Sequence, residues 1–399
     1  MPHPSNRTTD PAALIDKDTV RERHFHTRLG RCLVSGTPYL GAVTALAAGL
    51  IVLAYAIHGP QVGEWASQAL ANGDWTIAPT WAAMLHMAGL TALQTLPAVI
   101  AAYVAHGVAD RSAILPGFLG GVAAIVAEGG VLCGVIAGVV AGAAVLALQR
   151  IPVKRALHSA TAVLFPLLAT VITLFVTLAV VGSLLKTLTK WLYNEMAGLE
   201  FESTLTLGLL LGLMACSDLG GLITKTAFAF GAVELSGPDP ADFTPLNMSI
   251  MAAVMAAGMV PPMAMTLATL VRRSLFTEAE RRYGKISWLF GAAFLPEGAA
   301  PFALADPLRV IPASMAGGAV TGALVMQLGS TISYPRGGVF AAGQLGQPWL
   351  FAAAVAAGVL TTTALTVGLK SLRRRTAPAA STARAATRAP KKAVAAGRA

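Results

Sequence analysis

The stretch FLPEGAAPFALADPLRVIP, residues 294–312, places charges and helix breakers inside an apolar part of the chain. Glu297, Asp306 and Arg309 interrupt it, and four prolines are spread along it. Proline before Glu297 and glycine after it both weaken a continuous helix. Glu297 is therefore predicted to lie at a bend and not inside a regular helix.

The rest of the chain is strongly apolar. Of its 399 residues 55% are hydrophobic and 12% are charged, a charged share that is about half that of a soluble domain. Apolar runs such as 167–185 and 352–369 approach the roughly 20 residues that span a bilayer as a helix. Because these runs are continuous and do not alternate with polar residues, they favour helices over a barrel. The predicted fold class is an all-α polytopic membrane protein.

The net charge of +10 is interpreted as a signal for the orientation of the chain in the membrane, and not for nucleic-acid binding. Basic residues cluster in the tails and short loops, as cytoplasmic segments of membrane proteins do. We expect a cytoplasmic N-terminal tail (1–31), a membrane-embedded domain (32–370) and a disordered basic cytoplasmic tail (371–399). Both termini then lie inside, in a multi-pass protein of the cell (inner) membrane.

The charge of the loops predicts about ten crossings plus one re-entrant hairpin. Two short helices are expected to turn at Glu128, with Gly130, Gly134, Gly138 and Gly142 on one face that allows close packing. The other expected spans are 33–58, 81–108, 156–185, a short pair around 217–221, 248–271, 310–329 and 349–369. The loop 59–80 is expected outside, and 186–202 is expected beyond the end of its span.

The re-entrant hairpin is predicted between residues 287 and 304, with Glu297 at its tip. A carboxylate deep in a bilayer costs a few kcal/mol, and irregular backbone there is tolerated only where protein buries it or it lines a watery cavity. Such a tip suits sugar hydroxyls, because a carboxylate accepts two hydroxyl hydrogen bonds at once. The alternative is that Glu297 pairs with Arg309 or Lys225 and only holds helices together.

A second polar island is SDLGGLITK, residues 217–225. Asp218 and Lys225 lie at a break where Gly220 and Gly221 permit a tight turn. This island is either a second wall of the same cavity or a buried ion pair beside a turn. The segment ADPLR is typical of a helix start, in which Asp306 caps, a proline follows and Arg309 pairs locally, and the alternative is that Asp306 and Arg309 belong to the site.

The remaining candidate residues have structural interpretations. Cys32, Cys133 and Cys216 show no pairing or metal spacing, and the last two are expected to be small core residues. His86 and His106 are expected to be packed and hydrogen-bonded. No metal site, cofactor or catalytic residue is predicted.

Four motifs together resemble the membrane-embedded IIC component of the fructose-type sugar phosphotransferase system. They are ADRSAILPGFLGG (109–121), the glycine series through Gly142, SDLGGLITKTAFAFG (217–231) and PEGAAPFALADPLRVIP (296–312). The resemblance implies a homodimeric sugar permease that works with separate IIB and IIA phosphocarrier proteins. The phosphocysteine lies on IIB, so the chain is not catalytic alone, and fructose leaves as fructose 1-phosphate.

The resemblance also assigns the predicted sugar site. One part of this site is the last motif, with Glu297, Gly298, Pro301 and Phe302. The other part is the polar loop with Asp218, Gly220, Gly221 and Lys225. Pro296 stands where the family typically has threonine, and Leu222 and Thr224 stand where it has proline and asparagine. Two alternatives remain: a transporter of this fold that is uncoupled from phosphorylation, and a non-transporting scaffold or sensor.

Overall fold

The computed structural model describes residues 25–152, 158–199, 203–233, 235 and 244–376, and these are helical apart from turns and one isolated β-bridge between Ile332 and Leu345. The long helices are α2 (Phe25–His58), α4 (Ala78–Ala109), α6 (Gly130–Gln149), α7 (His158–Phe175), α8 (Gly182–Leu199), α11 (Pro245–Val271), α14 (Pro307–Leu328) and α15 (Pro348–Thr376). The shorter ones are α3 (Val62–Asn72), α5 (Ile114–Val126), α9 (Thr204–Ala215), α10 (Leu222–Val233), α12 (Glu278–Ala292) and α13 (Ala300–Ala305).

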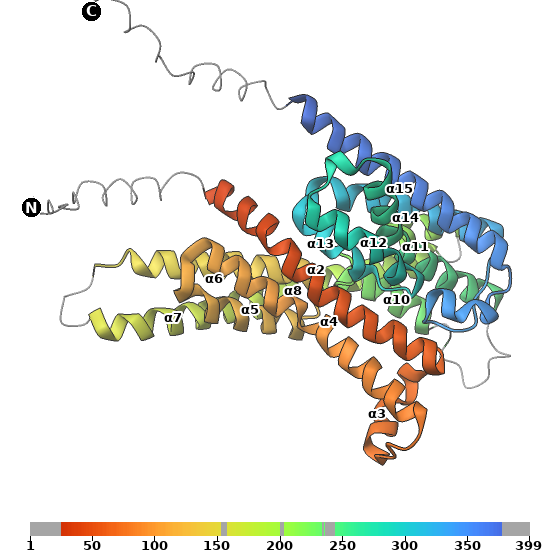
Figure 1. Cartoon of the computed structure of the whole chain (residues 1–399), viewed down its shortest axis with the longest axis horizontal. Helices are drawn as coiled ribbons and strands as arrows, with labels where there is room; N and C mark the ends of the chain where they lie inside the picture. The colour runs from red at the N-terminus through yellow and green to blue at the C-terminus, as the bar shows by residue number, and fades with distance from the viewer. Residues whose placement is uncertain (1–24, 153–157, 200–202, 234, 236–243, 377–399) are drawn as a thin grey trace, which may run out of the picture.

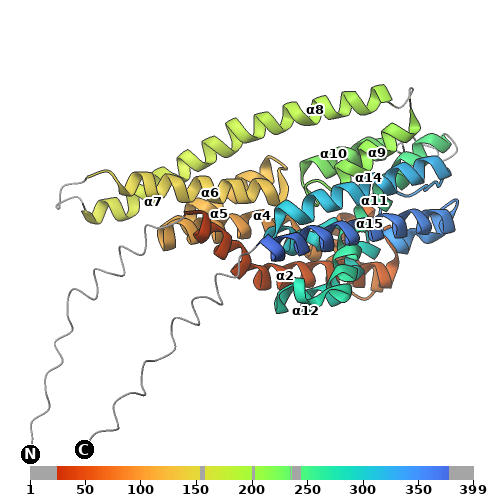
Figure 2. The ribbon, with the colours of Figure 1, turned by 90° about the horizontal axis from the view of Figure 1, so that it is seen from above.

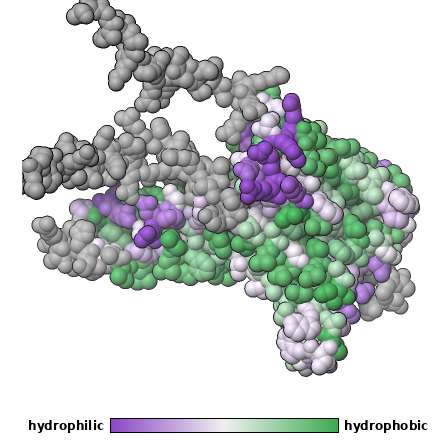
Figure 3. All heavy atoms as spheres, viewed as in Figure 1, coloured by the Kyte–Doolittle hydropathy of each residue, from purple (hydrophilic) through white to green (hydrophobic). Residues whose placement is uncertain are grey.

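The helices form an arm and a larger bundle (Figure 1). The arm contains α5, α6 and α7, and the bundle contains α9 to α15. Figure 2 shows α8 running along one side from the arm to α9 and α10. In the described residues, seven segments are long and apolar enough to cross a membrane. Figure 3 shows the mostly hydrophobic face that such a protein presents to lipid.

Glycines bring α5 and α6 against α4. A Cβ added at Gly134 would lie 2.6 Å from the Pro97 carbonyl oxygen, and one at Gly138 would lie 2.5 Å from that of Ala101. The residue numbers of the contact partners increase in the same direction along both helices, so α6 runs parallel to α4. The predicted glycine face is therefore confirmed as a close packing surface.

The bundle is built around α11, and 83% of the apolar stretch of this helix is buried inside the protein. α9 and α14 cross at small residues, since a Cβ added at Gly208 or Gly212 would overlap the carbonyl of Gly322 or Gly318. Thr321 of α14 donates a hydrogen bond to the Ala354 carbonyl of α15 at 3.3 Å. A helix buried on all sides suits the centre of a membrane bundle.

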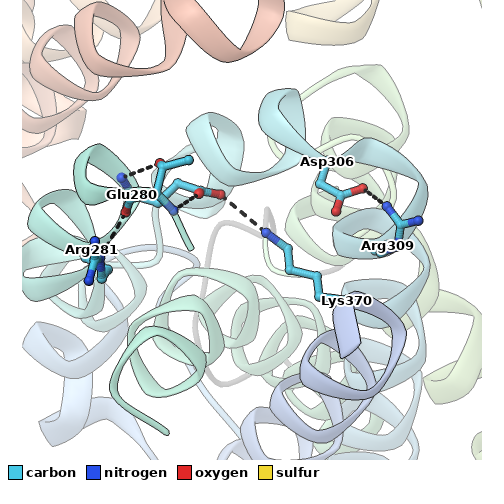
Figure 4. A network of polar contacts seen from close by, with 6 residues as sticks. Glu280, Arg281, Asp306, Arg309 and Lys370 are labelled. Atoms are coloured by element: carbon cyan, nitrogen blue, oxygen red, sulfur yellow. Dashed lines mark hydrogen bonds and ion pairs between the residues drawn. The ribbon is translucent and has the colours of Figure 1, made fainter. Parts of the chain in front are cut away.

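Two polar pairs fasten one end of the bundle (Figure 4). The Lys370 ammonium lies 3.3 Å from Glu280 and over the Phe276 ring at 4.2 Å, which ties α15 to α12. Arg309 lies 2.7 Å from Asp306 at the start of α14. Asp306 stands at the capping position but makes no capping hydrogen bond, so the expected local pair is confirmed and the expected cap is wrong.

Several expectations about elements can be compared with the structure. The turn at Glu128 is confirmed between α5 and α6. The segment 186–202 is not separate from its span, because α7, the π-helical residues Val176–Val181 and α8 continue it to Leu199. The loop 59–80 contains α3. At 12 residues each, about 18 Å, α9 and α10 are shorter than the roughly 30 Å hydrocarbon core.

The expectations for the cysteines and the histidines have different outcomes. Cys133 and Cys216 are buried, and the Cys216 thiol donates to the Ala257 carbonyl at 3.1 Å, as expected for core residues. His86 is packed at 1% exposure, but neither ring nitrogen has a hydrogen-bond partner in the described structure, so its expected hydrogen bond is wrong. His106 is exposed, so its expected packing is wrong. The Cys32 side chain, most of the 1–31 tail and residues 377–399 lie outside what the structure describes.

Candidate functional site

Three turns from distant parts of the chain meet at the candidate site. They join α5 to α6, α9 to α10, and α12 to the short 3-10 helix Pro296–Ala299. Each turn holds one non-glycine residue at positive φ, namely Glu128 (55°), Leu219 (50°) and Phe294 (60°). Only one other non-glycine residue of the described chain, Asp110, has a positive φ. Such conformations persist where the surroundings hold them, and they concentrate at functional sites.

Glycine allows the turns to touch through backbone. A Cβ added at Gly130 would overlap the Cα atom of Gly221, and one added at Gly220 would overlap the Glu297 carboxylate. Gly130 and Gly220 also have positive φ values of 63° and 93°. Of the two predicted glycines of the polar island, Gly220 is required by its positive φ and by the close approach of Glu297, whereas Gly221 is required by close approach alone, since an added Cβ would overlap the Asp218 carboxylate.

A cavity of about 180 Å³ opens between these turns and α4. Its polar lining consists of four side chains, Gln94, Glu128, Lys225 and Glu297, and the rest is mainly leucine, isoleucine, valine, proline and glycine. A cavity needs only about 10–15 Å³ to hold one water. The space can therefore hold a small polar ligand, with acceptors, a cation and an amide around it.

Glu297 is the polar group of the cavity that lacks a partner. Its Oε2 atom is buried and accepts no hydrogen bond from the described residues. Within the same described part, Glu297 makes no ion pair within 4.0 Å, although Lys225 lines the same cavity. Arg309 instead pairs with Asp306 and donates to the Leu369 carbonyl at 3.2 Å. An unpaired buried carboxylate oxygen is costly, so this position favours a ligand that donates hydrogen bonds.

The residues after Glu297 support the tip from behind. The Tyr283 hydroxyl and the Ser287 hydroxyl donate to the Gly298 carbonyl at 3.0 and 3.1 Å. Pro301 and Phe302 are buried, and the Phe302 ring packs 5.6 Å from that of Tyr283. Gly298, Pro301 and Phe302 are therefore placed in the packed core and not in the lining of the cavity.

Asp218 organises the turn that carries Lys225. Its carboxylate accepts hydrogen bonds from the backbone N–H groups of Ile223 (2.7 Å) and Thr224 (3.0 Å), and from the Thr224 hydroxyl (2.6 Å). It thus satisfies the free N–H groups at the start of α10. Lys225 has an exposed side chain and lines the cavity, so the two residues of the polar island have different surroundings.

Two lining residues were not singled out for the site from the sequence. Gln94 is a lone amide within the apolar helix α4, and Glu128 was assigned only to a turn. The signal for both was a polar residue in an apolar setting, the same signal that identified Glu297. What the sequence lacks is the tertiary proximity that puts these residues around one space.

Comparison with known proteins gives relatives of one kind. The fructose permease IIC component of Bacillus amyloliquefaciens is 38% identical, over 71% of this chain and 91% of the relative. The PTS system fructose-specific EIIC component of Haloferax volcanii is 30% identical, over 87% of this chain and 94% of the relative. None of the protein-family profiles matches the chain.

Larger proteins also match. The PTS system fructose-specific EIIABC component of Bacillus subtilis is 38% identical over 70% of this chain. The match spans about 44% of that relative's length. Two of the three relatives are therefore covered almost completely, and the third for less than half.

Proposed function

Because this chain belongs to the family of fructose-specific IIC components of the phosphotransferase system, we propose that it is a sugar permease whose substrate is fructose. The substrate follows from the names of these relatives. The observation that carries the proposal for the site is the buried, unpartnered Oε2 of Glu297 beside a cavity. A sugar hydroxyl donating to this oxygen would remove the cost of leaving it unpaired.

In this proposal the sugar lies among the four polar side chains of the cavity. Glu297 and Glu128 accept from hydroxyl groups, Lys225 donates, and the Gln94 amide does both. Gly220 lines the cavity with its backbone, Gly221 packs against Gly130, and Asp218 sets the direction of the turn that bears Lys225. Gly298, Pro301 and Phe302 hold the tip, while Asp306 and Arg309 fasten the start of α14.

The phosphoryl group comes from a separate protein. The donor is the phosphocysteine of IIB, itself charged by IIA. The S–P bond of the carrier breaks, a P–O bond to the sugar hydroxyl forms, and the carrier thiolate takes up a proton. The burial of Cys133 and Cys216 supports a carrier thiol on the partner. IIC chains are proposed to work as a homodimer.

The proposed membrane arrangement assigns the tip to a re-entrant hairpin. α12 approaches the tip and α13 returns from it, between α11 and α14. With about ten crossings, both termini of the domain 32–370 lie in the cytoplasm, and the protein resides in the cell (inner) membrane. The tails 1–31 and 371–399 then flank this domain on the cytoplasmic side.

The experiment that tests the function is uptake of labelled fructose in cells with and without the phosphocarrier proteins. We expect fructose phosphate inside the cells only when the carriers are present. Unmodified fructose inside the cells would instead indicate a transporter uncoupled from phosphorylation. Absence of uptake by well-folded protein would indicate a scaffold or sensor, and either result would overturn the proposal.

A further inference from the structure

One exposed surface of the bundle is strongly basic. We define the basic patch as Arg272, Arg273, Arg281, Arg282 and Lys285, all of them exposed. They occupy the turn after α11 and the first two turns of α12. Figure 3 shows a hydrophilic area over this part of the molecule, surrounded by a largely hydrophobic surface.

The positive charge of the basic patch is mostly unopposed. Two acids lie in the same segment. Glu278 is exposed and pairs with Arg282, whose hydrogen bond and charge hold the pKa of Glu278 below its usual range. Glu280 is buried and bonded to Lys370. Five exposed cations against one exposed acid (5 − 1) leave a net charge of +4 facing solvent.

Helix α12, which carries part of the basic patch, also reaches the proposed sugar site. Arg281, Arg282 and Lys285 are on its exposed side, whereas its buried side carries Tyr283 and Ser287. These two hydroxyls hold the Gly298 carbonyl, next to Glu297. A protein that binds the exposed side of α12 therefore contacts the same helix that positions the turn carrying Glu297.

The position of the cations favours a soluble partner over lipid. Arg281, Arg282 and Lys285 stand within α12, which is not among the seven membrane-crossing segments of the described chain. Cations that only anchor a span cluster at the end of its apolar run. A stripe that continues two turns into a separate helix instead presents a structured surface for recognition by an acidic protein face.

We propose that the basic patch is the docking surface for an acidic face of the IIB phosphocarrier. This inference rests on the proposed function, because it needs a carrier that delivers phosphate to the cavity. Relatives named EIIABC and EIIB'BC show that IIB occurs in one polypeptide with IIC in this family. The inference adds where on this chain the separate carrier binds.

The test compares Arg281→Gln/Arg282→Gln/Lys285→Gln with a control that removes two cations elsewhere, Arg111→Gln/Arg150→Gln. The control removes exposed cations from the arm. Each protein is reconstituted in vesicles of neutral lipid and mixed with purified, phosphorylated fructose-type IIB. We expect the triple variant to need at least about tenfold more IIB for half-maximal fructose phosphorylation, with less dependence on salt. Fructose binding without IIB should stay within about twofold for both variants.

The outcomes separate the two proposals. An unchanged IIB requirement in the triple variant, with working wild-type protein, overturns the docking surface alone. A defect that appears only in vesicles containing anionic lipid overturns it too, because the patch would then recognise the membrane. If wild-type protein neither binds fructose nor supports its phosphorylation, the proposed function fails and the docking surface with it.

Discussion

Glu297 differs from the other acids that this bundle buries. The Asp218 carboxylate accepts three hydrogen bonds, and Asp306 and Glu280 each pair with a cation. Glu297 alone among these four has a buried oxygen without a partner. The contrast separates three acids that are satisfied by the protein from one acid that is not, and it supports the proposed role of Glu297 in ligand binding.

The first prediction concerns this carboxylate. Glu297→Gln replaces an acceptor oxygen by a donor NH₂ group without changing the size of the side chain. A hydrogen bond to a charged group contributes about 1.5–3 kcal/mol, so losing one lowers uptake by at least about tenfold. Labelled-fructose uptake measures this, and thermal unfolding in detergent should be unchanged. Normal uptake by the variant would refute the assignment of the site.

A second prediction separates Asp218 from Lys225. Asp218→Ala leaves buried N–H groups at the start of α10 unpaired and should destabilise the protein by at least about 2 kcal/mol. Lys225→Gln should leave the unfolding temperature unchanged, because the side chain is exposed, but weaken fructose binding about tenfold. Thermal unfolding and equilibrium binding measure the two effects. The reverse pattern would show that Asp218 contacts sugar and Lys225 is structural.

At the level of elements, the glycine series makes α6 sensitive to small changes. Gly138→Ala puts a methyl group against the Ala101 carbonyl and should cost about 1–3 kcal/mol, as overpacking does. Gly368→Ala on α15 is the matched control, because an added Cβ there meets no atom within 4 Å. The unfolding temperatures of both variants measure the difference. Equal stability would mean that α4 and α6 are not packed as described.

The pair that joins α12 to α15 allows a double-mutant cycle. Glu280→Gln or Lys370→Met each leaves one buried charge without its partner and should cost about 3–5 kcal/mol. The double variant should cost less than the sum of the two, since no charge remains unpaired. Thermal unfolding of all four proteins gives the coupling. Additive losses would show that the two side chains do not interact.

Elements with a strong local signal could be predicted from the sequence. The turn at Glu128 follows from the charge of the flanking loops together with dense glycine, and it is confirmed. The continuation into α8 was missed because Lys186, Lys190 and Glu195 suggested a loop. All three lie exposed on one helix, where charged residues are solvated and leave the apolar side buried.

The candidate site was only partly predictable for a different reason. Glu297 stands out locally, because charge, proline and glycine coincide in an apolar stretch. Gln94 and Glu128 become members of the site only when α4 and the α5–α6 turn meet the tip. That meeting depends on packing between segments about 200 residues apart, which no local pattern encodes.

For the whole molecule, the arrangement predicts which ends face each side of the membrane. α2 begins and α15 ends toward the same end of the molecule, and the turn after α3 lies toward the other (Figure 1). In a Cys32→Ser background, Asp74→Cys should react with an impermeant thiol reagent in intact cells. Arg273→Cys should react only after permeabilisation. Labelling of both from one side would overturn the proposed orientation.

The whole cavity depends on contact between the arm and the bundle. Gly130 from the arm meets Gly221 from the bundle through backbone atoms, with no side chain between them. At this point the distance between the two tips is set by the backbone itself and not by the length of a side chain. A methyl group at position 130 would push the two walls apart, so the closure of the pocket on this side depends on the smallest residue standing there.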